Sequence, residues 1–346
     1  MSKRNKIIVF IVILLILLVL IFVISPKALA NWRWRQTAQA VGGLPYQIGL
    51  TKVAIIQCIT TGNPPICAGG PLCATLDVAR CTAYSEVNGT PSGGMGLDGL
   101  LRGRGNVLSG ILNGIDDTEW NPATDEHLAA RFDAADSAPR ALNKAELQAR
   151  FGLRPDPAAP LFVFIGRLAW QKGVDLVLEA LPALLAEGGQ LAILGTGEAE
   201  LEERCLGAAQ AHHGRIGAVI GFDEALARLG YGGADAVLVP SRFEPCGLAQ
   251  LCALRYGAPP VVARVGGLAD TVIDANEAAL AAGTGTGVQF APPSAEALAA
   301  AIQRTVALFR DAPAWAQVQR NAMAADVSWR RSAARYAALF HGLVHG

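Results

Sequence analysis

The chain has 346 residues, which is enough for two ordinary domains or for one large domain with an appendage. It carries 29 basic and 29 acidic residues, so its formal net charge is zero, and charged residues make up only 17% of the sequence. Because nucleic-acid binding depends on an excess of basic residues, this balance argues against nucleic acid as a partner.

The first 25 residues explain part of the high mean hydropathy of +0.33. A short basic head precedes an uninterrupted apolar run that begins at Ile7 and ends at Ile24. As a helix this run extends about 27 Å, close to the ~30 Å hydrocarbon core of a bilayer. We therefore predict an uncleaved, single-pass membrane anchor over residues 1–26. A signal peptide cleaved near residues 28–30 and a buried core helix are the alternatives, and the run is long for a signal peptide.

Residues 27–94 are rich in Cys, Gly and Pro and differ from the sequence that follows. They hold four of the seven cysteines, Cys58, Cys67, Cys73 and Cys81. Closely spaced cysteines in even number behind a membrane segment favour two disulfides in an oxidising compartment. Their spacing does not fit a zinc ribbon. We expect a domain boundary near residues 93–95, with one domain over residues 95–346.

From about residue 95 short apolar runs alternate with helical patterns. One helix is expected over residues 174–189, another is expected to begin at residues 269–271, and the last two helical stretches, residues 312–325 and 328–345, are expected to be packing helices. The apolar runs, each expected to be a buried strand, are residues 161–168, 191–197, 216–222, 234–241, 259–267 and 286–293. Short continuous strands alternating with helices are typical of a parallel sheet covered on both faces. The sequence thus predicts a doubly wound, Rossmann-like α/β domain. Such domains bind ligands beyond the carboxyl ends of their strands.

Two basic residues follow the first predicted strand. Arg167 comes directly after it, and Lys172 precedes the next helix. A guanidinium and an ammonium near a helix N-terminus suit a diphosphate, although a solvated loop with two charges is the alternative. The sequence "LGTGE" at residues 194–198 lacks a complete glycine-rich phosphate motif, so we interpret it as a tight turn between strand and helix.

Further candidates follow the later strands. Gly266 and Gly267 would allow backbone N–H groups to approach an anion closely. Glu244 ends a predicted strand, and the N–H groups near Gly247 lie where a helix begins, so acceptor and donors together could hold sugar hydroxyls. Phe222 follows another strand and could stack on a base, or it could be a core residue. This set of groups indicates a nucleotide-sugar site.

Seven motifs follow one another in a characteristic order: "GMGLDGLLRGR", "GILNGID", "WNPATD", "FIGRLAWQKGVDL", "LGTGEAELE", "GGADAVLVPSRFEPCGLAQL" and "VGGLADTV". With these motifs the chain resembles, from about residue 95 to residue 345, the C-terminal domain of bacterial glycogen (starch) synthases. That family consists of GT-B glucosyltransferases that use ADP-glucose. The resemblance covers nearly three quarters of the chain and implies retaining α-1,4-glucosyl transfer to an α-glucan acceptor in the cytoplasm, with no metal and no cofactor.

The resemblance also implies roles for individual residues, with Arg167, Lys172 and Glu244 as the catalytic ones. Arg167 and Lys172 would neutralise the ADP leaving group, and Phe222 stands where the family commonly has a tyrosine stacked on adenine. Glu244 would contact the donor glucose. The backbone amides that would hold sugar and phosphate are those of Cys246, Gly247 and Leu248.

The sequence departs from the wider GT-B pattern in two respects. A second glutamate, eight residues after the first, is replaced by Cys252, as is often the case in this branch. The N-terminal lobe of the family carries a Lys-x-Gly-Gly-Leu motif, whose only counterpart here is "AVGGL" at residues 40–44. We therefore expect residues 1–94 to be an unrelated membrane-anchored leader in place of that lobe.

Three interpretations follow. The chain is a donor-binding domain joined to a foreign leader, or an enzyme whose first lobe comes from a separate chain, or a non-catalytic, membrane-anchored nucleotide-sugar-binding or scaffold protein. A disulfide-type leader and a domain that uses a cytosolic donor indicate different compartments, which favours the first interpretation.

Overall fold

The computed structural model describes residues 109–345 of the chain. The predicted membrane anchor, the cysteine-rich leader and the boundary near residue 95 lie outside these residues. Among the helices of residues 109–345, none combines the length and the apolar character needed to cross a membrane.

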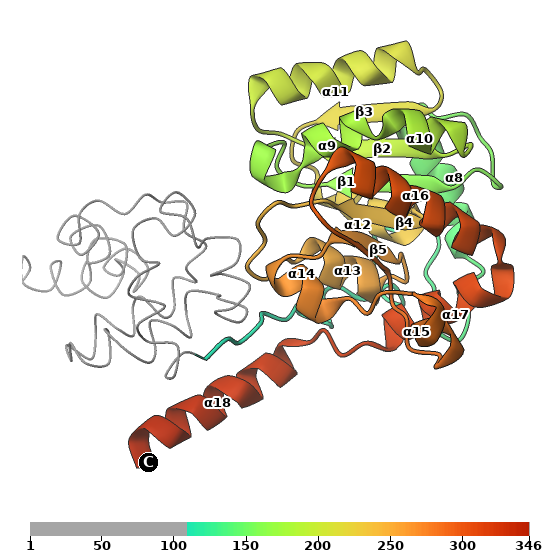
Figure 1. Cartoon of the computed structure of the whole chain (residues 1–346). Coiled ribbons are helices and arrows are strands. Elements are labelled where there is room, and N and C mark those ends of the chain that lie inside the picture. The colour runs from blue at the N-terminus through green and yellow to red at the C-terminus, as the bar shows by residue number, and fades with distance from the viewer. Residues whose placement is uncertain (1–108, 346) are drawn as a thin grey trace, which may run out of the picture. The chain divides into compact units, whose positions relative to one another are not determined.

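Six short strands form one parallel sheet with the order β3-β2-β1-β4-β5-β6 (Figure 1). All neighbouring strands pair in parallel. This arrangement confirms the predicted doubly wound α/β fold. The strand order reverses between β1 and β4, and the crevice beside such a reversal is where ligands bind in folds of this class. The strands are β1 (Leu161–Ile165), β2 (Gln190–Gly195), β3 (Ile216–Ile220), β4 (Ala236–Val239), β5 (Pro260–Ala263) and β6 (Val288–Phe290).

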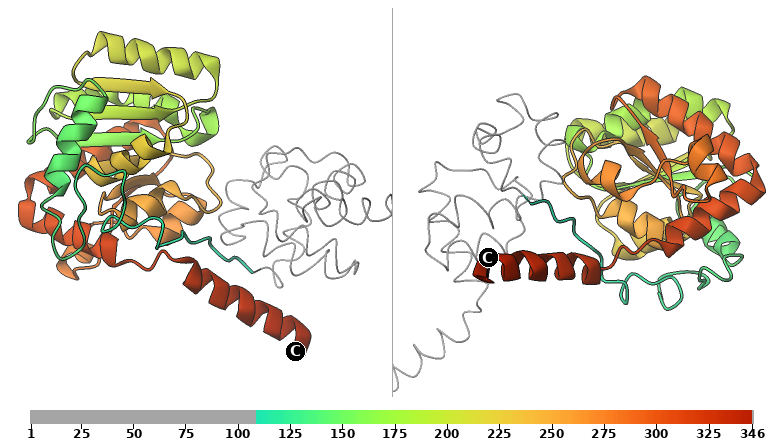
Figure 2. Two further views of the ribbon diagram at one scale, coloured as in Figure 1. Left: turned by 180° about the vertical axis from the view of Figure 1, so that it is seen from behind. Right: turned by 60° about the horizontal axis from the view of Figure 1, so that its bottom comes forward.

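Helices cover both faces of the sheet (Figure 2). One face carries four helices that pack on one another: α9 (Val174–Glu179), α10 (Leu181–Ala186), α11 (Ala199–Ala211) and α16 (Ala295–Arg310). The other face carries α8 (Arg140–Arg150), α12 (Glu224–Gly233) and α13 (Ala249–Arg255). The remaining helices of the described residues are α14 (Gly266–Thr271), α15 (Glu277–Ala281), α17 (Ala312–Ala324) and α18 (Trp329–His345).

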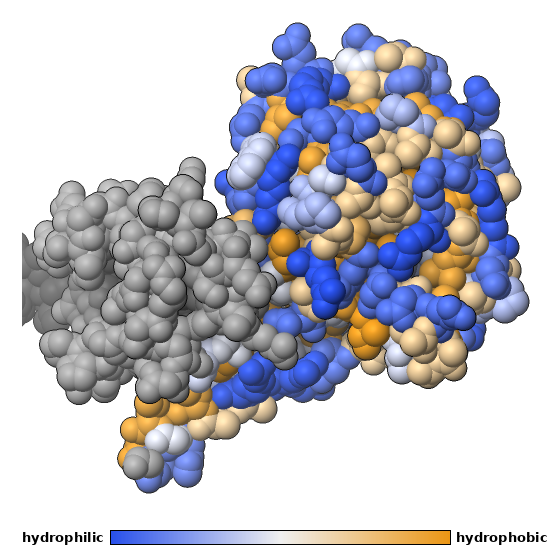
Figure 3. Space-filling model, in the orientation of Figure 1, coloured by the Kyte–Doolittle hydropathy of each residue, from blue (hydrophilic) through white to orange (hydrophobic). Residues whose placement is uncertain are grey.

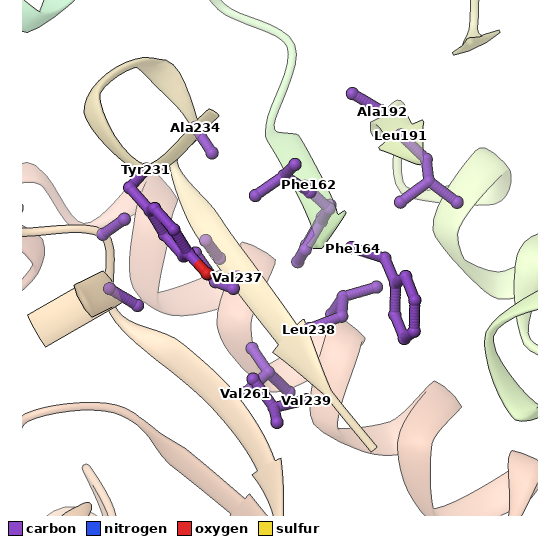
Figure 4. Close-up of a cluster of buried hydrophobic side chains, with 14 of the residues drawn as sticks. Phe162, Phe164, Leu191, Ala192, Tyr231, Ala234, Val237, Leu238, Val239 and Val261 are labelled. Atoms are coloured by element: carbon purple, nitrogen blue, oxygen red, sulfur yellow. The ribbon is translucent and has the colours of Figure 1, made fainter. Parts of the chain in front are cut away.

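The core explains why these apolar runs form strands. Every residue of β2, β4 and β5 is buried, as expected of strands covered on both faces. Figure 4 shows the contact across β1 and β4, where the buried side chains of Phe162, Phe164, Val237 and Leu238 gather. This packing sets β1 and β4 side by side, and the loops that follow them carry the candidate site.

Three elements differ from the sequence-based expectation. One helix was expected after β1, but α9 ends at Glu179 and α10 begins two residues later, with Pro182 in its first turn. Proline lacks the N–H that a continuous helix needs and suits a helix start. α14 begins at Gly266, three residues earlier than the expected start near Ala269. α8 was not predicted; it carries polar side chains such as Asn143 and Gln148 on its buried face, which weakens the apolar period.

The segment before α8 is fixed to the sheet domain by a cluster around Arg228 of α12. The guanidinium of Arg228 lies 2.8 Å from the Glu119 carboxylate, 3.6 Å from that of Asp125 and 4.2 Å from the centre of the Trp120 ring. The hydroxyl of Tyr256 donates a hydrogen bond to Asp125. These partners compensate the charge of the buried guanidinium, so removal of one of them would leave part of that charge unpaired at a cost in stability.

α17 and α18 were both expected to be packing helices. α17 buries Trp315 and Val318 and fits that expectation, whereas α18 buries only Ser332. Leu343 and Val344 near the end of α18 are exposed. Figure 3 shows hydrophobic residues gathered over this end of the helix.

A matched pair of glycine substitutions tests the close packing of the β1 and β2 ends. A Cβ on Gly195 would lie 1.9 Å from the carbonyl oxygen of Gly166, so Gly195→Ala should destabilise the fold by about 2 kcal/mol or more. Gly207, in the exposed middle of α11, has open space around it. Gly207→Ala should therefore stabilise by about 0.5–1 kcal/mol. Urea unfolding followed by circular dichroism measures both values, and equal effects of the two substitutions would contradict the packing.

Candidate functional site at the switch point of the sheet

The candidate site is formed by the loops that follow β1 and β4. The β1 loop holds Arg167 and leads into the short 3₁₀ helix η2 (Trp170–Lys172), and the β4 loop holds Glu244. These two strands are neighbours at the point where the strand order reverses. Both loops therefore border the crevice in which doubly wound domains bind their ligands.

An ion pair joins the two loops. The Nζ of Lys172 contacts the Oε2 of Glu244, and the same oxygen accepts a hydrogen bond of 3.0 Å from the hydroxyl of Ser241. The side chain of Glu244 is only 9% exposed and that of Lys172 is 27% exposed. The structure thus brings together two of the three residues predicted to be catalytic, and it adds Ser241 as a partner of the acid.

Arg167 is exposed and is connected to the same pair of loops through Gln171. Its Nη2 donates to the Oε1 of Gln171 at 2.6 Å, while the Nε2 of Gln171 donates to the carbonyl of Phe243 at 2.9 Å. The side chain of Gln171 therefore links the predicted cation to the residue that precedes Glu244. The hydrogen bond to Gln171 therefore orients the Arg167 side chain at the edge of the crevice.

The two glycines after β5 let α14 approach the Glu244 loop. A Cβ on Gly266, whose φ is +45°, would lie 2.2 Å from the carbonyl oxygen of Glu244, and one on Gly267 would lie 2.4 Å from that of Cys246. The N–H of Gly267 donates to the Glu244 carbonyl at 3.0 Å. In this structure the pair allows backbone-to-backbone packing, and its contact with an anion stays a prediction.

The residues after Glu244 lead into α13. Cys246 is buried, and its Sγ accepts a hydrogen bond of 3.0 Å from the N–H of Asn113. Gly247 has a φ of +75°, which favours glycine, and Leu248 is exposed directly before the helix. The Nε2 of buried Gln250 donates to the carbonyls of Cys246 and Gly247 at 2.7 and 3.2 Å. This segment is thus held in place from inside the domain.

Phe222 lies at the end of β3, with a side chain that is 89% exposed. The alternative of a core phenylalanine is therefore wrong. β2 lies between β3 and β1 in the sheet, so the strand that leads to Phe222 lies two strand spacings, about 10 Å, from β1. That separation leaves room for an extended ligand between the aromatic ring and the cations.

The "LGTGE" segment is a tight turn, as interpreted from the sequence. The hydroxyl of Thr196 and the N–H of Gly197 both donate to Oε1 of Glu202 in α11, at 2.6 and 2.7 Å. These hydrogen bonds hold the pKa of Glu202 below its usual range. The donors that a phosphate would use are thus bonded to a carboxylate of the same chain.

Sequence reasoning missed the residues that join the loops. Gln171 directly precedes Lys172, and Ser241 and Arg242 lie three and two residues before Glu244. All three carry side-chain donors, which was the available signal. Cys252, at the position of the second glutamate, is buried in α13, and burial raises the pKa of its thiol to about 12. It therefore supplies no charge at neutral pH. The described residues contain no group of three or more side chains that could hold a metal ion.

Known proteins resemble this chain in sequence and in structure. Residues 146–317 match the model of the family "Glycosyl transferases group 1". A glycogen synthase of Rhodopseudomonas palustris is 58% identical over 277 residues, which are 80% of this chain and 57% of that protein. A glycogen synthase of Acidiphilium cryptum is 59% identical over 260 residues, which are 75% of this chain and 54% of that protein.

The catalytic domain of starch synthase IV from Arabidopsis thaliana, solved with ADP and acarbose, has a TM-score of 0.71 and 32% identity, and the match covers 78% of this chain and 57% of that chain. The fold and the family match define a group 1 glycosyltransferase domain of the GT-B type. Within that class, the domain is close to glycogen synthases. The chain spans little more than half the length of the curated relatives it matches.

Proposed function

We propose that this domain binds ADP-glucose, the donor whose glucose is transferred to the end of a growing α-1,4-glucan. The observation that carries the proposal is the meeting of Lys172 and Glu244 at the switch point of the sheet. A cation and an acid side by side suit the two halves of a sugar nucleotide, because the diphosphate needs positive charge and the sugar hydroxyls need an acceptor. The starch synthase IV structure, which contains ADP, supports the same donor.

Each predicted residue receives a role in this proposal. Phe222 stacks on the adenine, Arg167 and Lys172 hold the diphosphate, and Glu244 accepts hydrogen bonds from the glucose. As the bond between glucose and ADP breaks, negative charge gathers on the diphosphate, and cations that are already in place stabilise it. The remaining contacts to sugar and phosphate come from the backbone amides of Cys246, Gly247, Leu248, Gly266 and Gly267.

The Lys172–Glu244 ion pair must open when the donor binds. In the structure the ammonium group of Lys172 is bonded to the carboxylate of Glu244. A bound diphosphate competes with this carboxylate for the ammonium group, and the sugar then takes the place of Lys172 beside Glu244. Lys172 and Glu244 thus give up their contact with each other: Lys172 binds the diphosphate, and Glu244 binds the sugar.

Glucosyl transfer by a whole enzyme involves more than the described domain. The matched regions cover 57% and 54% of the two glycogen synthases, so the remainder of such an enzyme has no counterpart in the alignments. We propose that efficient transfer requires the remaining lobe of such an enzyme in addition to the described domain. The family suggests a cytoplasmic location, and residues 7–24, if they form an anchor, would attach the domain to a membrane.

Replacing Lys172 by alanine tests the donor site. Wild-type protein should bind ADP in titration calorimetry, and Lys172→Ala should weaken ADP about tenfold or more, because one charged hydrogen bond to the diphosphate is lost. Adenosine, which has no phosphate, should bind both proteins with similar affinity. Arg310→Ala, which removes an exposed ion pair with Glu187, is the control. Absence of heat at millimolar ADP with folded wild-type protein rules out the proposal.

Glu244→Gln should act in the opposite direction on ADP. The substitution removes the charge that competes for Lys172, so ADP should bind as tightly as before or about two- to fivefold more tightly. ADP-glucose should no longer bind more tightly than ADP, because the amide is a weaker acceptor for the sugar hydroxyls than the carboxylate. Calorimetry with both ligands measures the ratio of the two affinities. A parallel loss of both affinities would show that the ion pair does not compete with the ligand.

Transfer by the chain alone should be slow or undetectable. Purified chain, labelled ADP-glucose and glycogen are incubated, and label in the glycogen is counted. Addition of the separately produced N-terminal half of a related glycogen synthase should raise the rate if a second chain completes the site. Rapid transfer by the chain alone, at a rate unaffected by that addition, would contradict this expectation.

A further inference from the structure

Arg242, two residues before Glu244, connects the β4 loop to the opposite side of the crevice. Its two terminal nitrogens donate to the two carboxylate oxygens of Asp175 in α9, at 2.8 and 2.6 Å. Its Nη1 also donates to the carbonyl of Trp170 at 2.7 Å, and its guanidinium lies 4.6 Å from the centre of the Trp170 ring. The backbone N–H of Arg242 donates to the carbonyl of Gln171 at 2.9 Å.

The residues that Arg242 contacts lie on both sides of Lys172 in the sequence. Trp170 and Gln171 come before it and Asp175 comes three residues after it, and all three are bonded to Arg242. Glu244 is only two residues from Arg242. The backbone on both sides of the Lys172–Glu244 pair is therefore fixed by one side chain and its own peptide N–H.

The geometry of this contact requires arginine. The side chains of Arg242 and Asp175 are 18% and 13% exposed, so water screens the pair only partly. Burial alone would raise the pKa of Asp175, but the hydrogen bonds and the charge of Arg242 hold it below its usual range. A planar guanidinium can meet two carboxylate oxygens, a carbonyl and an aromatic face at once, which a lysine ammonium cannot do.

We propose that Arg242 is a positioning residue for the diphosphate site: by holding the β1 loop and the β4 loop together, it sets Lys172 at the place where the diphosphate binds. This inference rests on the proposed function, because it assumes that Lys172 receives a diphosphate. The Arg242 guanidinium is engaged by Asp175 and Trp170, and in this proposal it does not bind the donor itself. Its effect reaches the ligand through the backbone of residues 170–172.

The test compares three variants of the full chain by titration calorimetry with ADP and with adenosine. Arg242→Ala should weaken ADP about tenfold, while adenosine changes less than about twofold, because only the phosphate contacts depend on Lys172. Arg242→Lys should lose nearly as much ADP affinity as Arg242→Ala, since it cannot restore the two-oxygen contact. Free guanidinium at millimolar concentration should restore part of the ADP affinity of Arg242→Ala and none of that of Arg242→Lys.

Arg304→Ala provides a matched control. Arg304 also meets both oxygens of an aspartate, Asp274, at 3.0 and 3.1 Å, but this pair lies after β5 and does not join the loops of the site. The control should bind ADP like the wild type. Asp175→Asn should cause a smaller loss in the same direction, because it leaves one acceptor oxygen and the contacts of Arg242 with Trp170 in place. The double variant should be no worse than Arg242→Ala, because without Arg242 the Asp175 carboxylate no longer holds the loop.

The outcomes separate this inference from the proposed function. A wild-type protein that does not bind ADP overturns both. A wild-type protein that binds ADP, with variants that lose ADP and adenosine equally or lose neither, overturns only the role of Arg242. If Arg242→Ala does not fold, Arg242→Lys and Asp175→Asn provide the same comparison of ADP with adenosine. Selective loss of ADP together with guanidinium rescue establishes the positioning role.

Discussion

The pairing of β1 with β4 is the constraint on which the candidate site depends. Each strand alone delivers a loop with one charge, and only their parallel alignment brings Lys172 beside Glu244. The buried side chains between the sheet and its helices fix that alignment, so the energy that places the two charges comes from the apolar core. The charges themselves contribute chemistry to the site and little to the stability of the fold.

Close backbone approach is the second requirement around Glu244. Gly173 and Gly266 occupy positions where a Cβ would lie 2.2 Å from a carbonyl oxygen, of Pro240 and of Glu244 respectively. The elements on both sides can therefore reach the β4 loop without a gap. A loop packed in this way has few conformations, which holds the acid in place before any ligand arrives.

The sequence predicted the parallel sheet, since continuous apolar runs have few other uses in a chain of this size. It also named Lys172 and Glu244 as candidates, because charged residues stand out at the ends of apolar runs. The contacts that join the β1 loop to the β4 loop could not be predicted from the sequence. Arg242 and Asp175 are 67 positions apart, and no periodic pattern relates them. Likewise, the split between α9 and α10 depends on one proline whose effect competes with a strong helical period.

The unequal burial of the ion pair explains which partner can move. Glu244 is nearly enclosed and keeps the hydroxyl of Ser241 as a second hydrogen-bond partner, so a shift of the acid would break two contacts and leave a charge in a dry place. Lys172 is three times as exposed and carries a flexible stem. In the proposed donor complex the diphosphate therefore draws the ammonium of Lys172 towards itself, while the carboxylate of Glu244 remains where the fold has placed it. The rigid acid and the movable cation suit a ligand whose phosphate and sugar must be held on adjacent strands.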